Sequence, residues 1–282
     1  MTEQQKNFPE FYVTSAQPCP YLPGRFERKL FTHLTHDKQP ALIDNLLKGG
    51  FRRSQNIAYT PYCEGCQACV SVRVLVDEFE PSKNMKRTIS ANRDIEATRH
   101  MPRPSAEQYS LFRDYIDVRH GDGGMADMSV LDYAQMVEDS VVNTFITEYR
   151  LRRPLEPRRA DGSLDLAGPL YGVALCDRLS DGISMVYSFY DVDQAERSLG
   201  SYIILEHIEY ARSLGLPYVY LGYWVPGSPK MGYKSSFAGL EIYKGKVEPL
   251  AHFLAGVKDG LARQVLGSTR VSLLHGQDSR QR

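Results

Sequence analysis

Residues 182–224 read GISMVYSFYDVDQAERSLGSYIILEHIEYARSLGLPYVYLGYW, and the order of patterns in this stretch sets the fold class. Gly182 to Tyr190 and Pro217 to Tyr223 are apolar, aromatic runs of strand length. Leu199 to Ser213, which lies between them, has the length and spacing of a helix. A strand, a helix and a second strand in this order predict a β-α-β crossover with two parallel strands.

Helices and strands are also expected before the crossover. Two capping pairs, Ser105 with Gln108 and Ser129 with Asp132, predict helices that run to about residues 120 and 141. Strand patterns cover 144–149, 168–177 and 182–190, with a long polar loop over 151–167. Helix pairs, antiparallel strands and one crossover together indicate an α+β protein.

The first hundred residues have a different character. A helix opens at Pro40, and a strand is expected over 70–76. A basic helix is expected from Ser82 to about Thr98. We therefore expect two domains, residues 1–103 with a cysteine cluster and residues 104–282 with the crossover.

Charge is balanced over the whole chain but not locally. The 34 Lys+Arg match the 34 Asp+Glu, so net charge gives no sign of a nucleic-acid partner. The segment 81–103 is basic and is either a solvated face or a contact for nucleic acid. No apolar run has the length of a membrane span, and the start MTEQQKNFPEF lacks the features of an export signal, which predicts a cytoplasmic protein. The basic side chains of interest in the segment 81–103 are Lys83, Lys86, Arg87 and Arg93.

Four cysteines are arranged as metal ligands often are. Cys63, Cys66 and Cys69 form a C-x2-C-x2-C motif, and Cys19 supplies a fourth thiol. Four thiolates are the number that tetrahedral zinc or an iron–sulfur cluster requires. The alternative is a group of reduced thiols in a small core. Cys176 lies in a strand pattern and is expected to be buried.

A loop rich in Pro, Gly and Ser follows the last strand of the crossover. The strand leads into it with Tyr223 and Trp224, and Lys230 and Lys234 follow. Aromatic rings and lysines at the carboxyl end of a strand suit a rim that holds a ligand, although the rings are equally compatible with covering the core. The helix start at 198–201 offers backbone N–H groups to a phosphate or an oxyanion, and we expect it to lie near Asp191 and this loop.

Blocks of sequence along the chain resemble aminoacyl-tRNA–protein transferases. The blocks CPYL (19–22), GFRRSQNIAYTP (50–61), the cysteine motif with VSVRV, and FEPSKNMKRTISANRD (79–94) resemble the amino-terminal domain of these enzymes. DGISMVYSFYD, the crossover itself and GSPKMGYKSSFAGLE (227–241) resemble their carboxy-terminal domain. The blocks cover most of residues 10–242 in the right order. The compact chain is more similar to the bacterial branch, the aspartate/glutamate leucyltransferases, than to the longer eukaryotic arginyltransferases.

The fold expected from the order of elements is α+β, with an amino-terminal cysteine-containing domain and an acetyltransferase-like (GNAT-type) carboxy-terminal domain. The Gly-rich loop with which acetyltransferases usually hold coenzyme A is missing, which weakens a coenzyme A interpretation. One departure from the eukaryotic relatives concerns the metal, because Leu22 and Ala68 stand where additional thiols are expected. Cys63 and Cys66 are candidates to replace them.

The resemblance implies the reaction. Leucine passes from leucyl-tRNA to the amino-terminal Asp or Glu of a protein, which creates an N-degron for proteolysis, and no cofactor is required for the chemistry. Alternatives are an arginyl-tRNA–protein transferase, an acetyl-CoA-dependent N-acetyltransferase, and a non-catalytic cysteine–metal module that binds nucleic acid or a protein partner.

The implied reaction gives each candidate residue a role. Tyr187, Tyr190 and Asp191 are candidates to orient the attacking amine or relay its proton. The first domain is expected to recognise substrate and tRNA, and the second to hold the catalytic site. Residues expected to bind substrate are Arg52, Arg53, Ser54, Tyr223, Trp224, Lys230 and Lys234, and those expected to bind the tRNA acceptor stem are Lys83, Lys86, Arg87 and Arg93.

Overall fold

The computed structural model describes residues 9–35, 40–121, 123–152, 168–243 and 273–274, and the chain divides into two compact units. The smaller unit comprises Met1–Ser71, Tyr223–Gly232 and Tyr243–Arg282, and the larger comprises Val72–Gly222 and Tyr233–Ile242. This division differs from the expected boundary at 103/104, because residues 72–103 belong to the larger unit. Most of the expected polar loop, residues 153–167, lies outside the described residues.

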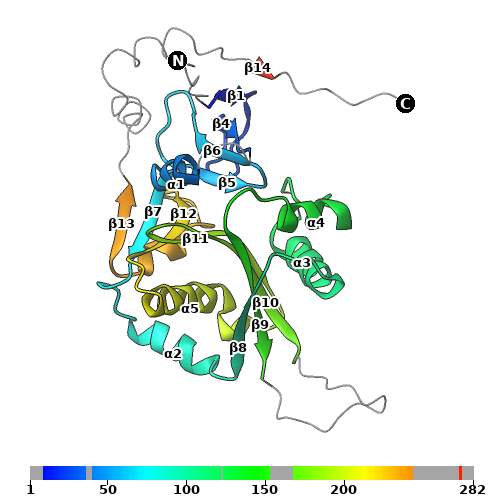
Figure 1. Ribbon diagram of the computed structural model, residues 1–282, viewed down its shortest axis with the longest axis vertical. Helices are drawn as coiled ribbons and strands as arrows, with labels where there is room; N and C mark the ends of the chain where they lie inside the picture. Colours follow the sequence, from blue (N-terminus) through cyan, green and yellow to red (C-terminus); the bar gives the residue numbers. More distant parts are fainter. Residues whose placement is uncertain (1–8, 36–39, 122, 153–167, 244–272, 275–282) are drawn as a thin grey trace, which may run out of the picture. The chain divides into compact units, whose positions relative to one another are not determined.

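A seven-stranded sheet forms the centre of the larger unit (Figure 1). Its strand order is β13-β7-β12-β11-β10-β9-β8, in which β8 to β11 pair antiparallel and β11 pairs parallel with β12. The mixed α/β class and the β-α-β crossover are thus confirmed. The strands are β7 (Val70–Leu75), β8 (Ile95–His100), β9 (Thr144–Leu151), β10 (Leu170–Arg178), β11 (Gly182–Tyr190), β12 (Tyr218–Trp224) and β13 (Leu240–Tyr243).

Helices cover both faces of this sheet. Figure 1 shows α3 (Ala106–Arg119) and α4 (Val130–Glu138) on one side of β9 to β11, and α5 (Leu199–Ser213) with α2 (Lys83–Ala91) on the other. Neighbouring residues of β10 explain the two layers, because side chains alternate along a strand. Val173 belongs to the core cluster of α3 and α4, whereas a Cβ at Gly172 would lie 3.2 Å from Ile203 of α5. The missing side chain at Gly172 therefore lets α5 approach the sheet.

The prediction of a basic helix from Ser82 to about Thr98 was wrong in its length. The structure ends α2 at Ala91 and begins β8 at Ile95. Asn92 accounts for the break: it is fully buried, and its side-chain amide donates to the Thr88 carbonyl at 2.8 Å. An asparagine that bonds to the backbone in this way competes with helix continuation.

The smaller unit contains a five-stranded sheet in the order β14-β1-β4-β6-β5. β4 pairs antiparallel with β1 and β6, and β5 forms an antiparallel hairpin with β6. The hairpin places Arg52 opposite Tyr59 and Arg53 opposite Ala58. The elements are β1 (Tyr12–Thr14), β2 (Gln17–Pro18), β3 (Phe26–Glu27), β4 (Lys29–His33), α1 (Pro40–Lys48), β5 (Arg52–Ser54), β6 (Ile57–Pro61) and β14 (Leu273–Leu274), of which β2 and β3 pair with each other.

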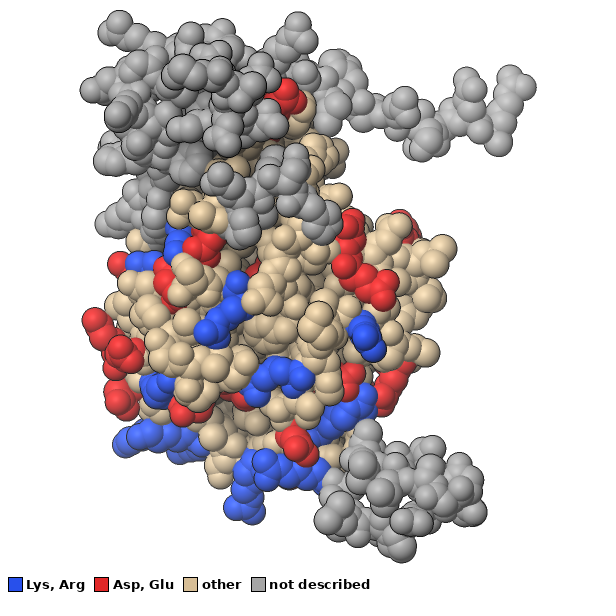
Figure 2. All heavy atoms as spheres, viewed as in Figure 1, with Lys and Arg blue, Asp and Glu red and all other residues tan. Residues whose placement is uncertain are grey.

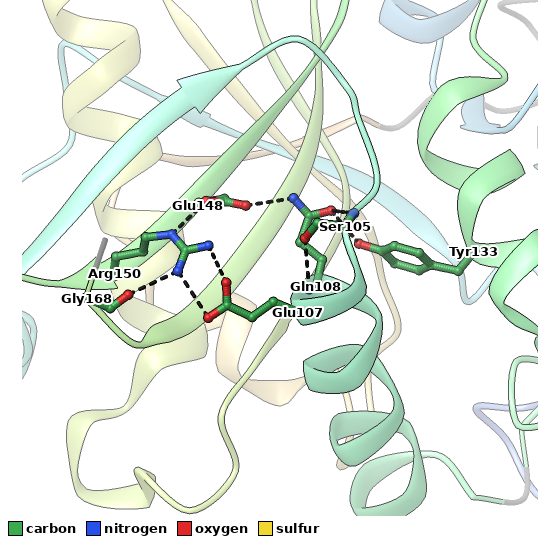
Figure 3. A network of polar contacts seen from close by, with 7 residues as sticks. All are labelled: Ser105, Glu107, Gln108, Tyr133, Glu148, Arg150 and Gly168. Atoms are coloured by element: carbon green, nitrogen blue, oxygen red, sulfur yellow. Dashed lines mark hydrogen bonds and ion pairs between the residues drawn. The ribbon is translucent and has the colours of Figure 1, made fainter. Parts of the chain in front are cut away.

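A polar network ties α3 and α4 to β9 in the larger unit (Figure 3). Gln108 completes the expected capping box with Ser105 and also donates to Glu148 Oε1 at 2.7 Å. Tyr133 of α4 donates to Gln108 Oε1 at 3.2 Å, and Arg150 donates to Glu148 Oε2 at 2.8 Å. Burial alone would raise the pKa of Glu148, but the hydrogen bonds from Arg150 and Gln108 outweigh it and hold the pKa below its usual value. The network thus needs Glu148 in its ionised form.

We predict that Glu148→Gln lowers the free energy of unfolding at pH 7 by about 1–3 kcal/mol, because Arg150 and Gln108 lose a charged acceptor. The lowered pKa means that Glu148 stabilises the fold fully above its unfolded pKa of about 4.3, and that this contribution disappears as the pH falls through the folded pKa. Urea unfolding of both proteins between pH 7 and pH 3 should therefore show the difference shrinking below about pH 4. The exposed Glu138→Gln of α4 is the control, with a change within about 0.5 kcal/mol. A difference that does not vary with pH would contradict the prediction.

Candidate functional site

The parallel pairing of β11 with β12 covers only the first part of each strand. Their parallel register joins Gly182, Ile183 and Ser184 to Tyr218, Val219 and Tyr220. β11 then continues to Tyr190, and β12 continues past Leu221. Backbone groups beyond the paired positions are freed from the ladder and need other partners. One such group is the Leu221 carbonyl, which accepts a hydrogen bond from Lys234 Nζ at 2.7 Å.

Asp191 lies directly after β11, at the start of the connection to α5. Its backbone N–H donates to the Tyr171 carbonyl at 2.9 Å, and its carboxylate accepts from the Asp193 N–H at 2.9 Å. The side chain is partly exposed and is held in a turn. The carboxylate is therefore held at the end of β11.

The first residues of α5 have no side chain that caps the helix. Ser198 takes the left-handed conformation with φ 51°, and its side chain makes no capping hydrogen bond. The helix begins one residue later, at Leu199. A helix start without a capping side chain keeps backbone N–H groups for solvent or a ligand.

Tyr190 packs against the same helix start. An added Cβ at Gly200 would lie 2.9 Å from the Tyr190 ring, so only glycine lets the ring come this close. The other side of the ring meets Tyr115 of α3, with a centroid distance of 5.0 Å. Tyr115 had no distinguishing signal in the sequence and was not among the candidates. The contacts on both sides fix the position of Tyr190 beside Asp191.

Tyr187 occupies a more enclosed position on β11. Its ring lies 6.3 Å from those of Phe112 and Phe189, at the edge of the core cluster. Burial raises the pKa of Tyr187 well above its usual value. The phenol stays protonated near neutral pH, so it can donate a hydrogen bond but does not serve as a phenolate base.

The two lysines of the loop after β12 lie in different surroundings. Lys234, within a short 3-10 helix (Gly232–Ser236), is only 6% exposed and contacts the Leu221 carbonyl through its ammonium. Lys230 is exposed. Lys234 therefore supports β12 through the Leu221 carbonyl, whereas Lys230 is accessible to a ligand.

Arg52 is the central cation of the smaller unit. It is 5% exposed, it donates to the Ser71 hydroxyl, and its guanidinium lies 5.6 Å from the centre of the Tyr223 ring. Tyr223 in turn lies 6.3 Å from the Tyr59 ring, and its hydroxyl is 3.0 Å from the Gly50 carbonyl. Burial raises the pKa of Tyr223, so this hydroxyl remains a donor.

The neighbours of Arg52 on the strand point elsewhere. Arg53 is equally buried, but its guanidinium donates to the Gln55 carbonyl at 2.9 Å, and Ser54 is exposed. The structure thus brings Arg52, Tyr59 and Tyr223 together and leaves Arg53 and Ser54 outside the group. Trp224, next along the chain, is partly exposed.

The three cysteines of the motif and Cys19 are partly buried and free of disulfides. Desolvation, helped by the nearby thiols of Cys19, Cys63 and Cys66, raises the pKa of Cys69 to about 12. Among the residues that the structure describes, no group of three or more His, Cys, Asp or Glu side chains is placed to hold a metal ion. A structural zinc or iron–sulfur cluster stays a prediction.

The basic side chains expected to bind tRNA are all exposed. Lys83, Lys86 and Arg87 lie on α2, and Arg93 lies in the turn before β8. Met85 is the one buried residue of this helix among those described. The helix therefore anchors itself by Met85 and presents its cations to solvent.

Sequence profiles of one family match both parts of the chain. The profile described as arginine-tRNA-protein transferase, C terminus, matches residues 107–244, and that for the N terminus matches residues 17–87. The aspartate/glutamate leucyltransferase of Sinorhizobium medicae is 58% identical over 238 residues, which are 84% of this chain and 90% of that protein. The chain belongs to the family of aspartate/glutamate leucyltransferases. A second member, from Azorhizobium caulinodans, is 56% identical over 237 residues, 84% of this chain and 94% of that protein.

Solved structures resemble the chain only distantly. FemX has a TM-score of 0.45 at 12% identity, covering 76% of this chain and 69% of its own. The L-PGS of Bacillus licheniformis has a TM-score of 0.41 at 12% identity, covering 73% of this chain and 68% of its own. Such values carry no conclusion about function. Within the described ranges, no helix is both long and apolar enough to cross a membrane.

We predict that Lys234→Met lowers the free energy of unfolding by about 1–3 kcal/mol, because the buried Leu221 carbonyl loses its donor. Lys230→Met is the matched control, since this lysine is exposed, and its effect should stay within about 0.5 kcal/mol. Urea unfolding monitored by circular dichroism measures both. Equal effects of the two substitutions would show that the Lys234 hydrogen bond does not stabilise the strand.

Proposed function

We propose that the protein transfers leucine from leucyl-tRNA to the amino-terminal Asp or Glu of proteins and so creates a degradation signal. The observation that carries this proposal is the 56–58% identity to aspartate/glutamate leucyltransferases along more than four fifths of the chain. A tRNA substrate also makes the cytoplasm the expected compartment. Protein substrates with amino-terminal Asp or Glu are part of the proposal.

The chemistry is an aminolysis of an ester. The nitrogen of the acceptor's α-amine attacks the leucyl carbonyl carbon, the bond to the tRNA ribose oxygen breaks, and the amine gives up a proton while the ribose oxygen gains one. An α-amino group has a pKa near 8, so roughly a tenth is neutral at pH 7. Holding both substrates in line can lower the barrier by about 7–11 kcal/mol. The reaction therefore depends on positioning more than on a strong base.

The larger unit offers suitable groups for this positioning. We assign the catalytic site to the edge where β11 ends, and the unit to an acetyltransferase-like fold. Asp191 is a partly exposed carboxylate that can accept a hydrogen bond from the amine, and Tyr190 beside it is fixed by Tyr115 and Gly200. Tyr187 contributes at most a protonated hydroxyl, because burial raises its pKa. The bare start of α5 provides N–H donors for the carbonyl oxygen as its charge develops.

The smaller unit offers a cation for the acidic acceptor. Arg52 is preorganised by Ser71 and Tyr223, and a guanidinium binds a carboxylate with two parallel hydrogen bonds. We assign Arg52, with Tyr59 and Tyr223, to recognition of the Asp or Glu side chain. Arg53 supports the hairpin through the Gln55 carbonyl.

Arginine is the second candidate donor, because the family profiles carry the name of arginine-tRNA-protein transferase. The decisive assay supplies leucyl-tRNA, arginyl-tRNA or acetyl-CoA with a labelled peptide that begins with Asp. We expect the peptide to gain leucine, with no product from acetyl-CoA and little from arginyl-tRNA. The same peptide beginning with Ala is the control and should not react. Preferential transfer of arginine, or of an acetyl group, would overturn the proposal.

A further prediction concerns Arg52. Arg52→Gln should lower kcat/KM for the Asp-initiated peptide by about tenfold or more, since a charge-assisted hydrogen bond contributes about 1.5–3 kcal/mol. Arg53→Gln, the adjacent and equally buried arginine, is the matched control and should change kcat/KM much less. Binding of leucyl-tRNA and the melting temperature are measured for both. A parallel loss of tRNA affinity or of folding in the Arg52 variant would contradict its role in reading the acceptor.

A further inference from the structure

A solvent-open hollow lies in the larger unit at the carboxyl end of α2. It has a volume of about 610 Å³ and is lined by Arg87, Ser90, Ala91, Arg93 and Asp94. Figure 2 shows Lys and Arg side chains gathered along the lower edge of the larger unit, the region in which Figure 1 places α2 and β8. The lining thus combines two arginines, a hydroxyl and one carboxylate.

The carboxylate does not cancel the positive charge of the two lining arginines. Both oxygens of Asp94 accept hydrogen bonds from Arg197, at 2.8 and 2.9 Å. Together Asp94 and Arg197 are formally neutral. Within the described part of the chain, neither Arg87 nor Arg93 forms an ion pair of its own. Two exposed guanidinium groups therefore remain for an anion.

A rigid frame holds the hollow, and we call it the clasp: Asn92, Asp94 and Arg197. The buried amide of Asn92 donates to the carbonyls of Thr88 and Arg197, each at 2.8 Å. Arg197 donates in return to the Ala91 carbonyl at 3.1 Å. The clasp thus fixes the end of α2 to the 3-10 turn Ala195–Arg197, which leads directly into α5.

The clasp also connects the hollow to the sheet edge where β11 ends, to which the catalytic site was assigned. Arg197 is one residue before Ser198, at the bare helix start, and six residues after Asp191. Arg87 and Arg93 accordingly lie on the same framework as the groups assigned to the acyl transfer.

We propose that this hollow binds a backbone phosphodiester of the tRNA, with Arg87 and Arg93 as its two cationic contacts. The proposal rests on the proposed function for the identity of the nucleic acid. The forked donors of arginine match the two unesterified oxygens of a phosphodiester. An open site fits one phosphate of a long chain, which enters from the side. Lys83 and Lys86 lie outside the lining.

The test measures binding of uncharged tRNA over a range of salt concentrations for Arg87→Gln, Arg93→Gln and the double variant. Each single substitution should weaken tRNA affinity by about threefold or more. It should also reduce the slope of log K against log salt concentration by about 0.7–0.9, because one fewer counterion is released on binding. The double variant should lose about twice that slope. The exposed Arg103→Gln, outside the hollow, is the charge-matched control and should leave the slope nearly unchanged.

Several results would overturn the proposal. One is an equal loss of affinity and slope for Arg103→Gln and Arg93→Gln, which would show diffuse attraction in place of a site. Another is loss of inorganic phosphate binding in the double variant with tRNA affinity and slope intact, which would assign the hollow to a small free anion. Because uncharged tRNA is the probe, the outcome is independent of leucine transfer. Normal transfer by a variant that binds tRNA with an unchanged slope would remove the site and leave the proposed function standing.

Discussion

β11 and β12 pair in parallel over only three positions, and much of the larger unit depends on that short contact. The pairing requires a crossover, and α5 supplies it by covering the sheet face on which Gly172 leaves room. Both strands continue beyond the paired positions. On β12 the Leu221 carbonyl is taken by a buried ammonium, and on β11 the chain continues to Tyr190 and Asp191. The support of β12 by Lys234 and the position of Asp191 at the end of β11 thus both lie beyond the same short pairing.

Buried or half-buried charged side chains restrict the arrangement of the segments around them most strongly. Arg52 in the smaller unit, and Lys234 and Glu148 in the larger one, are removed from solvent to different degrees, and each contacts a partner on a different segment. A desolvated charge is costly unless its partners are in place, so alternative arrangements are disfavoured more than the native one is stabilised. In each case the partner is a group that the fold presents in a single orientation. Such residues set the geometry around them even where they touch no substrate.

The crossover and both capping boxes could be predicted because their signals are local: strand length, helical spacing, and a serine three residues before a glutamine or aspartate. Family resemblance added the reaction class. The end of α2 was missed because the buried amide of Asn92 donates both to the Thr88 carbonyl and to the carbonyl of Arg197, 105 residues away, and the sequence does not reveal the distant partner. The separate contacts of Arg52 and Arg53 were equally hidden, since adjacent residues of a strand point to opposite faces and the sequence does not show which face meets Tyr223. The cysteine motif is conspicuous in sequence, yet its spacing alone does not determine how the thiols are arranged.

The two units are interleaved along the chain. The polypeptide leaves the smaller unit after Ser71, returns at Tyr223, leaves again after Gly232 and returns at Tyr243. During synthesis the smaller unit therefore cannot be completed until the larger one has emerged, because its segments Tyr223–Gly232 and Tyr243–Arg282 follow most of the larger unit along the chain. No single cut yields two self-sufficient halves, and a fragment beginning at residue 104 would lack β7, α2 and β8 of its own sheet and helix layer. Folding of this protein is accordingly expected to be one cooperative event that waits for the segments from Tyr223 onward, with exposure to proteases and chaperones until they are available.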